Sequence, residues 1–182
     1  MLPSQITREL CLEQLDPRHA DAIFRLTDEN RDYLRQWLPW VDNVHTAEDT
    51  RAFIITTQAQ FERNEGFQMA IVWQGNIVGA IGHHRIDWAN HSASLGYWLA
   101  APYQGKGMMT QACRVLVNHA FQALNLNRIE IRAATENYRS QAIPRRLGFK
   151  QEGIVREGEW LYDHFVDLMI FGLLRSDWQL SS

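Results

Sequence analysis

The alternation of apolar and polar positions along the chain predicts short strands interleaved with amphipathic helices. Strands are expected at residues 6–15, 67–73, 77–86, 92–99, 128–133, 149–155 and 164–174. Helices are expected from Asp16-Pro17 to residue 26, from 46 to 66, from 107 to 124, and in a short segment that ends at Leu147-Gly148. Only residues 92–133 form a strand-helix-strand crossover, which joins parallel strands. About seven strands and four helices therefore predict an α+β fold with a mixed, mostly antiparallel sheet.

Local signals support several of these boundaries. Thr46 followed by Asp49 is typical of a helix start in which each side chain caps the other's backbone. The turn Gln74-Gly75-Asn76 between two strands indicates a tight hairpin. The helix from 107 to 124 has one apolar face, made of Met109, Ala112, Cys113, Leu116, Val117, Ala120 and Phe121, which predicts that this face is buried.

Composition narrows the class of protein. The chain has 182 residues, of which 46% are hydrophobic, and it shows no repeat or linker, so a single domain over residues 1–182 is expected. A formal net charge of -3 does not favour a nucleic-acid partner. No apolar stretch approaches the roughly 20 residues of a membrane span, and the first residues lack a secretory signal. With Cys11 and Cys113 isolated from each other and from any metal-ligand cluster, we expect a soluble, cytoplasmic, metal-free protein.

The loop before the third helix is the strongest candidate for chemistry. Gly105 and Gly107 allow backbone conformations that turn several N–H groups toward one point, next to the positive end of the helix. Such a place binds phosphate. The loop is not a nucleotide-binding P-loop, because Lys106 is followed by Gly107 rather than Ser or Thr. A tight strand-to-helix turn without a ligand is the plainer interpretation of the same glycines.

Four ordered motifs resemble one family. They are Gly96-Tyr97-Trp98-Leu99, the run from Gln104 to Ala112, Asn137-x-x-Ser140, and Arg146-Leu147-Gly148-Phe149-x-x-Glu152-Gly153. Together they resemble the GCN5-related N-acetyltransferase (GNAT) superfamily, and within it the RimL-type ribosomal-protein N-terminal acetyltransferases. The resemblance covers almost the whole chain. It implies the GNAT fold, in which parallel strands 4 and 5 splay apart to form a cofactor crevice.

The resemblance implies acetyl-CoA as the co-substrate. The backbone N–H groups of the loop would hold its pyrophosphate; the residues concerned are Gln104, Gly105, Lys106, Gly107, Met108 and Met109. Met109 departs from the small residue that commonly ends this motif, as it often does in RimL-like members. Pantetheine would lie in the gap beside Trp98 and Leu99, held by the side chain of Asn137. An N-cap of the following helix is the alternative role for Asn137.

The resemblance also implies the proton-transfer residues. Pro144 stands where many members place a tyrosine general acid, so Ser140, which RimL-like enzymes are thought to use, is the candidate; it could instead only cap or pack the helix. Glu159, expected in a loop between the last two strands, matches the acidic residue proposed as base in RimL-like enzymes, with Glu157 as a nearby competitor. Partial desolvation beside Trp160 would raise the pKa of Glu159.

The acceptor is expected to be a primary amine. Trp37 and Trp40 belong to an aromatic cluster that borders the substrate cleft in RimL-like proteins, although core packing or a dimer contact would also explain them. The first hypothesis is that a homodimer directly acetylates the N-terminal α-amine of a protein, with a ribosomal protein as the acceptor. The alternatives are acetylation of a small amine, such as a polyamine, amino acid or drug, and a non-catalytic acyl-CoA-binding module, which would not need Glu159.

Overall fold

The computed structural model describes residues 5–178. Within them, seven strands form one sheet in the order β1-β2-β3-β4-β5-β7-β6. The strands are β1 Leu10–Gln14, β2 Phe67–Trp73, β3 Asn76–Asp87, β4 Ser92–Leu99, β5 Arg128–Ala134, β6 Lys150–Leu161 and β7 His164–Leu174. β4 and β5 run parallel, whereas the other neighbours in this sheet are antiparallel. This arrangement confirms the α+β GNAT fold.

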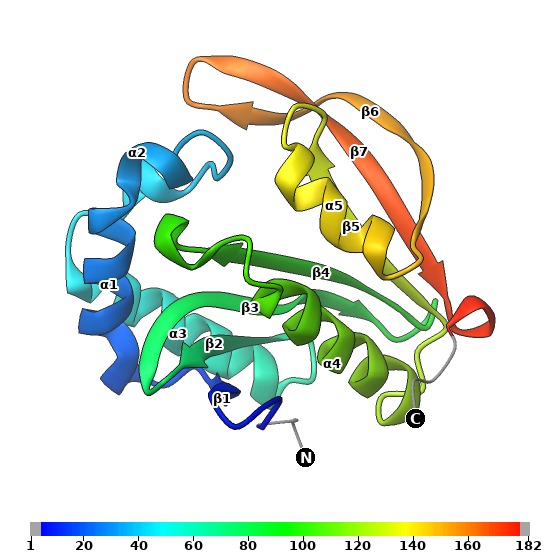
Figure 1. Ribbon diagram of the computed structural model, residues 1–182, viewed down its shortest axis with the longest axis horizontal. Helices are drawn as coiled ribbons and strands as arrows, with labels where there is room; N and C mark the ends of the chain where they lie inside the picture. The colour runs from blue at the N-terminus through cyan, green and yellow to red at the C-terminus, as the bar shows by residue number, and fades with distance from the viewer. Residues whose placement is uncertain (1–4, 179–182) are drawn as a thin grey trace.

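Helices cover both faces of the sheet (Figure 1). They are α1 Ala20–Glu29, the short α2 Arg31–Leu34, α3 Ala47–Glu62, α4 Met108–Gln122 and α5 Tyr138–Arg146. The buried face of α4 packs on one side of the sheet, whereas Ile23 of α1 and Ile54 of α3 form a second core on the other side. No helix among residues 5–178 has the length and apolar character needed to cross a lipid bilayer.

Local sequence chemistry explains where several elements begin. The Thr46 hydroxyl accepts from the Asp49 N–H at 3.3 Å while the Asp49 carboxylate accepts from the Thr46 N–H at 2.8 Å, so the capping box at the start of α3 is confirmed. Gln74 and Gly75, with φ of 50° and 80°, form the tight turn between β2 and β3, as the hairpin prediction requires.

Two strand boundaries differ from the prediction. The first strand begins at Leu10 rather than residue 6, because the Thr7 hydroxyl accepts from the Leu10 N–H at 3.1 Å and turns the preceding residues back on the chain. β6 continues beyond Val155 to Leu161. Its residues 150–158 are exposed, so this edge strand lacks the apolar alternation by which a half-buried strand is recognised.

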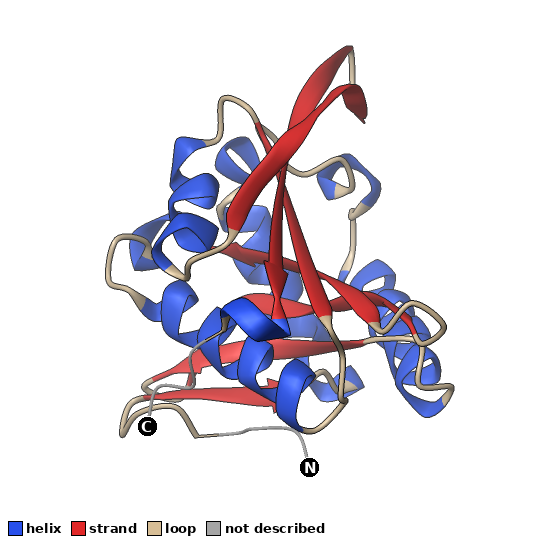
Figure 2. Ribbon diagram, turned by 90° about the vertical axis from the view of Figure 1, so that its right-hand side faces the viewer, coloured by secondary structure: helices blue, strands red, loops and turns tan. Residues whose placement is uncertain are grey.

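The sheet divides between its two parallel strands. β4 pairs with β5 only through Ser92–Ser94 and Arg128–Glu130, so residues 95–99 have no strand partner on that side. The strands fall into two groups that run in different directions, as Figures 1 and 2 show. The predicted splay of strands 4 and 5 is therefore present, and it opens the crevice in which the site lies.

Candidate active site

A cavity of about 1000 Å³ occupies the crevice. It is lined by the end of β4, the loop at residues 103–107, the first two turns of α4, one side of α5, and the segment that contains α2. The loop and helix starts form what we call the cofactor half. Tyr33, Leu34, Trp37 and Leu38 line the opposite side. We call residues 31–44 and the β6–β7 hairpin, which contacts them through Tyr162 without itself lining the cavity, the acceptor half.

The loop of the cofactor half depends on two glycines. Gly105 and Gly107 have φ of 75° and 76°, a left-handed conformation that other L residues rarely adopt. A Cβ atom at Gly105 would meet nothing within 4 Å, so the backbone angle rather than space requires glycine there. Gly107 is also the N-cap of α4, whose first N–H groups have no helical partner. The loop therefore has the backbone geometry that an anion-binding role requires, and that role stays a prediction.

Side chains of the loop stabilise its conformation and leave the loop open. Gln104 Nε2 donates to the Leu99 carbonyl at 3.1 Å, and Gln104 Oε1 accepts from Arg139 Nη1 at 3.1 Å. Gln104 thereby ties the end of β4 to α5. Met108 and Met109 are buried in the main core, so the large side chain at position 109 leaves the loop open.

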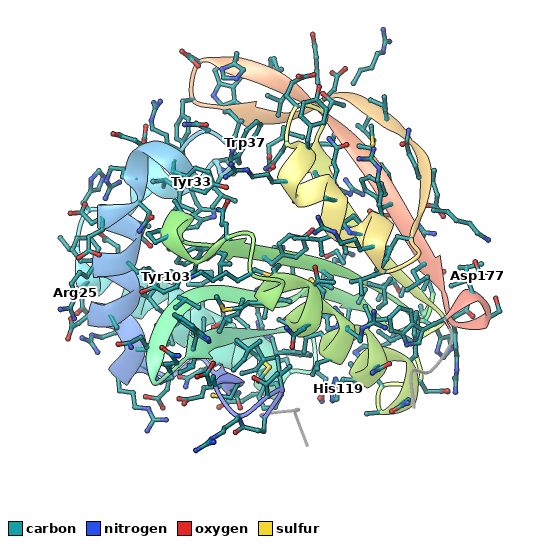
Figure 3. The ribbon with its side chains drawn as sticks, viewed as in Figure 1. Arg25, Tyr33, Trp37, Tyr103, His119 and Asp177 are labelled. Atoms are coloured by element: carbon teal, nitrogen blue, oxygen red, sulfur yellow. The ribbon has the colours of Figure 1, made fainter. Side chains whose placement is uncertain are left out.

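The cation of Lys106 lies close to aromatic rings. Its Nζ is 4.7 Å from the centroid of the Trp73 ring and 5.6 Å from that of Tyr103. Figure 3 shows Tyr103 between α1 and α4. Contacts of this kind are favourable for an ammonium group, and they keep a positive charge on the loop that is predicted to bind pyrophosphate.

Asn137 and Ser140 meet at the start of α5. Asn137 Oδ1 accepts from the Ser140 N–H at 3.0 Å, so Asn137 is the N-cap that its position also suggested. Both residues line the cavity. Because the cap uses only the oxygen of the Asn137 amide, its Nδ2 group can still donate to a ligand. The α5 helix begins at Tyr138 and includes Pro144, so the proline does not delay the start of the helix.

Glu159 lies within β6, not in a loop, so the prediction of a loop at this position is wrong. It pairs with Val166 just after a register shift in the β6–β7 ladder. It shares a strand face with Leu161, which is 1% exposed, whereas Trp160 points to the opposite face and contacts Phe165. Burial raises the pKa of Glu159 above its ordinary value. Glu159 is not among the residues that line the cavity, so its role as base stays a prediction.

Aromatic side chains form the wall of the acceptor half. Tyr33 and Trp37 line the cavity, and Figure 3 shows both on the α2 segment, across from α5. Trp40 lies behind this lining, with its ring 6.0 Å from that of Trp98. Trp37 thus lines the cavity, whereas Trp40 packs against Trp98, which lines it.

A bridge connects the two segments of the acceptor half. The Tyr162 hydroxyl, in the β6–β7 turn, donates to the Leu38 carbonyl. The Arg35 guanidinium lies 4.0 Å from the centroid of the Tyr162 ring and pairs with Asp42 at 2.9 Å. Figure 1 shows the hairpin reaching toward the segment that follows α2. We call this contact the Tyr162 bridge.

Two tyrosines that join parts of the site, Tyr97 and Tyr162, had no role predicted from the sequence. Tyr97 was noted only as part of a motif, although a hydroxyl among the inward positions of a strand that also holds Ala93, Leu95 and Leu99 signals a buried polar contact. No local pattern indicates the Tyr162 bridge. Cys113 is buried on α4, where burial raises the pKa of its thiol, as expected for a core residue rather than a nucleophile.

Comparison with known proteins identifies the class of protein. A family model described as the acetyltransferase (GNAT) domain matches residues 9–150. The chain therefore belongs to the GNAT acetyltransferases, and it is an acetyl-CoA-dependent N-acetyltransferase.

Its relatives include proteins named for ribosomal substrates. The chain is 33% identical to YdaF of Bacillus subtilis (strain 168) over 180 residues, which are 98% of each chain. It is 29% identical to the ribosomal-protein-serine acetyltransferase of Escherichia coli (strain K12), covering 92% of this chain and 93% of that protein. A structure of the RimL ribosomal L7/L12 alpha-N-protein acetyltransferase in complex with coenzyme A aligns with a TM-score of 0.91 and 27% identity, over 94% of this chain and 97% of that chain.

Proposed function

We propose that this enzyme acetylates the N-terminal α-amine of a protein, with a ribosomal protein as the substrate class. One observation carries the proposal. A single cavity is lined both by the glycine loop and by the aromatic wall of Tyr33 and Trp37. An acceptor that enters along the wall therefore reaches the same crevice in which a thioester anchored at the loop by its pyrophosphate would lie. The names of the relatives support a ribosomal acceptor.

The residues of the cofactor half fit acetyl-CoA. The N–H groups of residues 104–109 would hold the pyrophosphate at the start of α4. Pantetheine would lie along the edge of β4 at residues 95–99, which lacks a β5 partner, and would accept from Asn137 Nδ2. When bound, the cofactor supplies the acetyl thioester, and these residues orient it.

An α-amine makes modest demands on the rest of the site. Its pKa of 7.7 to 8.0 leaves about a tenth of it neutral at pH 7, whereas a lysine is neutral well below one part in a thousand. The bound thioester would supply the acetyl carbonyl that the neutral nitrogen attacks, with cleavage of the C–S bond. Glu159 would accept the amine proton through water, and Ser140 would donate its proton to the departing thiolate and regain one from water. Alignment of the two reactants contributes roughly 7 to 11 kcal/mol of the barrier.

The acceptor class is tested with defined amines. Purified protein is given acetyl-CoA and peptides with a free N-terminus, the same peptides with a blocked N-terminus and an internal lysine, and a panel of polyamines and amino acids. We expect mass spectrometry to find one acetyl group on the α-amine of the free peptides alone. Preferred acetylation of a small amine would contradict the proposal. Ribosomal proteins from a strain without the gene are expected to lose an N-terminal acetyl group.

Glu159→Gln tests the base. Because a glutamine cannot accept the amine proton, we expect kcat/KM near pH 7 to fall by at least about tenfold and to recover partly at pH 9, where the amine is already neutral. Glu157→Gln is the matched control, since this exposed neighbour uses its N–H to bind Asp167 and should retain normal activity. An unchanged rate for Glu159→Gln across the whole pH range would remove Glu159 from the mechanism.

The homodimer and the cytoplasmic location belong to the same proposal. Both rest on the resemblance to RimL-type enzymes and on the isolated cysteines. Light scattering of the purified protein between about 1 and 100 μM would report the assembly state, and a constant monomer mass would contradict the dimer.

A further inference from the structure

The α5 helix lacks one of its own hydrogen bonds. In an α-helix the N–H of residue 144 donates to the carbonyl of residue 140. Pro144 has no N–H, and it lies within α5. The Ser140 carbonyl therefore needs a partner from outside the helix, since a backbone oxygen in a partly buried place is costly to leave without one.

Tyr97 of β4 provides that partner. Its hydroxyl donates to the Ser140 carbonyl at 3.0 Å. The residue lies beyond Ser94, where the pairing of β4 with β5 ends. One hydrogen bond thus joins the two sides of the crevice at a level where no strand pairing does so.

The same phenol also reaches the side chain of Ser140. The Ser140 Oγ lies 3.5 Å from the Tyr97 oxygen. Because the Tyr97 proton is donated to the carbonyl, the phenol oxygen is left to accept from the Ser140 hydroxyl. With the N–H of Ser140 held by Asn137, the residue is fixed through its N–H, its carbonyl and its hydroxyl. Burial raises the pKa of Tyr97, so the phenol keeps its proton throughout the working range of the enzyme.

We propose that Tyr97 is a positioning residue, which replaces the helical hydrogen bond removed by Pro144 and holds the Ser140 hydroxyl against the cofactor crevice. Tyr97 itself transfers no proton. The expected effect of Tyr97 on catalysis rests on the proposed function of Ser140. The replacement of the missing helical hydrogen bond by the hydrogen bond from Tyr97 does not depend on that function.

A double-mutant cycle between positions 97 and 144 tests the proposal. Tyr97→Phe keeps the ring and removes the donor, and we expect kcat to fall about tenfold with a smaller change in the KM for the acceptor. Pro144→Ala returns an N–H to the helix and by itself should leave activity near that of the native enzyme. In the double variant, the new N–H binds the Ser140 carbonyl, and most of the lost kcat should return. A double variant as impaired as Tyr97→Phe would overturn the proposal, as would an unchanged kcat in Tyr97→Phe.

Two further measurements separate this proposal from the proposed function. Hydrogen exchange of residues 138–143, followed by mass spectrometry without any substrate, should be faster in Tyr97→Phe and normal in the double variant. Equal exchange in all variants would refute the replacement even if the enzyme acetylates α-amines. In a Ser140→Ala background, Tyr97→Phe should lower kcat no further. If the enzyme prefers another amine, that acceptor is used in the cycle, so the two failures remain distinguishable.

Discussion

The two halves of the cavity are built in different ways. In the cofactor half, backbone geometry dominates: the left-handed Gly105 and Gly107 and the start of α4 place N–H groups within a few consecutive residues. In the acceptor half, side chains connect segments that are far apart, since Tyr162 and Leu38 are separated by 124 positions. A binding site for an invariant cofactor can be encoded locally, whereas a site for a particular acceptor here requires contacts between distant loops.

Acidification tests whether both halves unfold together with the sheet that carries them. Burial lowers the pKa of His83, in β3, from 6.5 to about 4. Between these pH values the unfolded chain binds a proton that the folded chain does not, so stability falls as the pH falls. The difference between the two pKa values corresponds to about 3 kcal/mol of the free energy of unfolding. Urea unfolding at pH 7 and pH 4 should show this loss, and His83→Leu should reduce it.

His91→Leu is the control for His83, because the side chain of His91 is exposed in the folded state. It should keep the pH dependence of the native protein. The same loss of stability in His83→Leu and the native protein would show that other groups are responsible. If the cofactor half unfolded at a different urea concentration from the acceptor half, the two halves would not share one cooperatively folded core.

Gly107→Ala tests the cofactor half alone. A left-handed alanine costs about 1 to 2 kcal/mol, and relief of that strain would turn the loop N–H groups away from a common point. We expect calorimetry to show coenzyme A affinity reduced by about 10- to 100-fold. Gly153→Ala is the matched control, since a Cβ there meets nothing within 4 Å and its φ is not positive. Unchanged affinity in Gly107→Ala would show that the loop is not the pyrophosphate site.

Tyr162→Phe tests the acceptor half alone and is expected to have the smallest effect. It removes the hydrogen bond to Leu38 but keeps the ring that contacts Arg35. A single hydrogen bond is worth about 1 kcal/mol, so the KM for an acceptor peptide should rise about fivefold. The KM for acetyl-CoA serves as the internal control and should not change. A rise in the latter would mean that the two halves are not independent.

The fold features that were predictable also differ from the others in depending on residues close in sequence. The helix start at Thr46, the hairpin at Gly75 and the buried face of α4 were predictable, because each depends on residues close in sequence. The extent of β6 was not, because its exposed residues carry no apolar alternation. Glu159 was consequently assigned to a loop, and only the ladder with Val166 shows that it belongs to a strand.

The sequence by itself determined the order of elements and the glycine loop, since backbone angles and apolar periodicity are local properties, and its motifs carried the resemblance to the family. Only the tertiary structure decided which donor satisfies the Ser140 carbonyl, and that Tyr162 meets Leu38. A hydroxyl can bind any acceptor that the topology brings near it, so its partner depends on how distant strands are placed. In this protein, that placement depends on the early end of the pairing between β4 and β5.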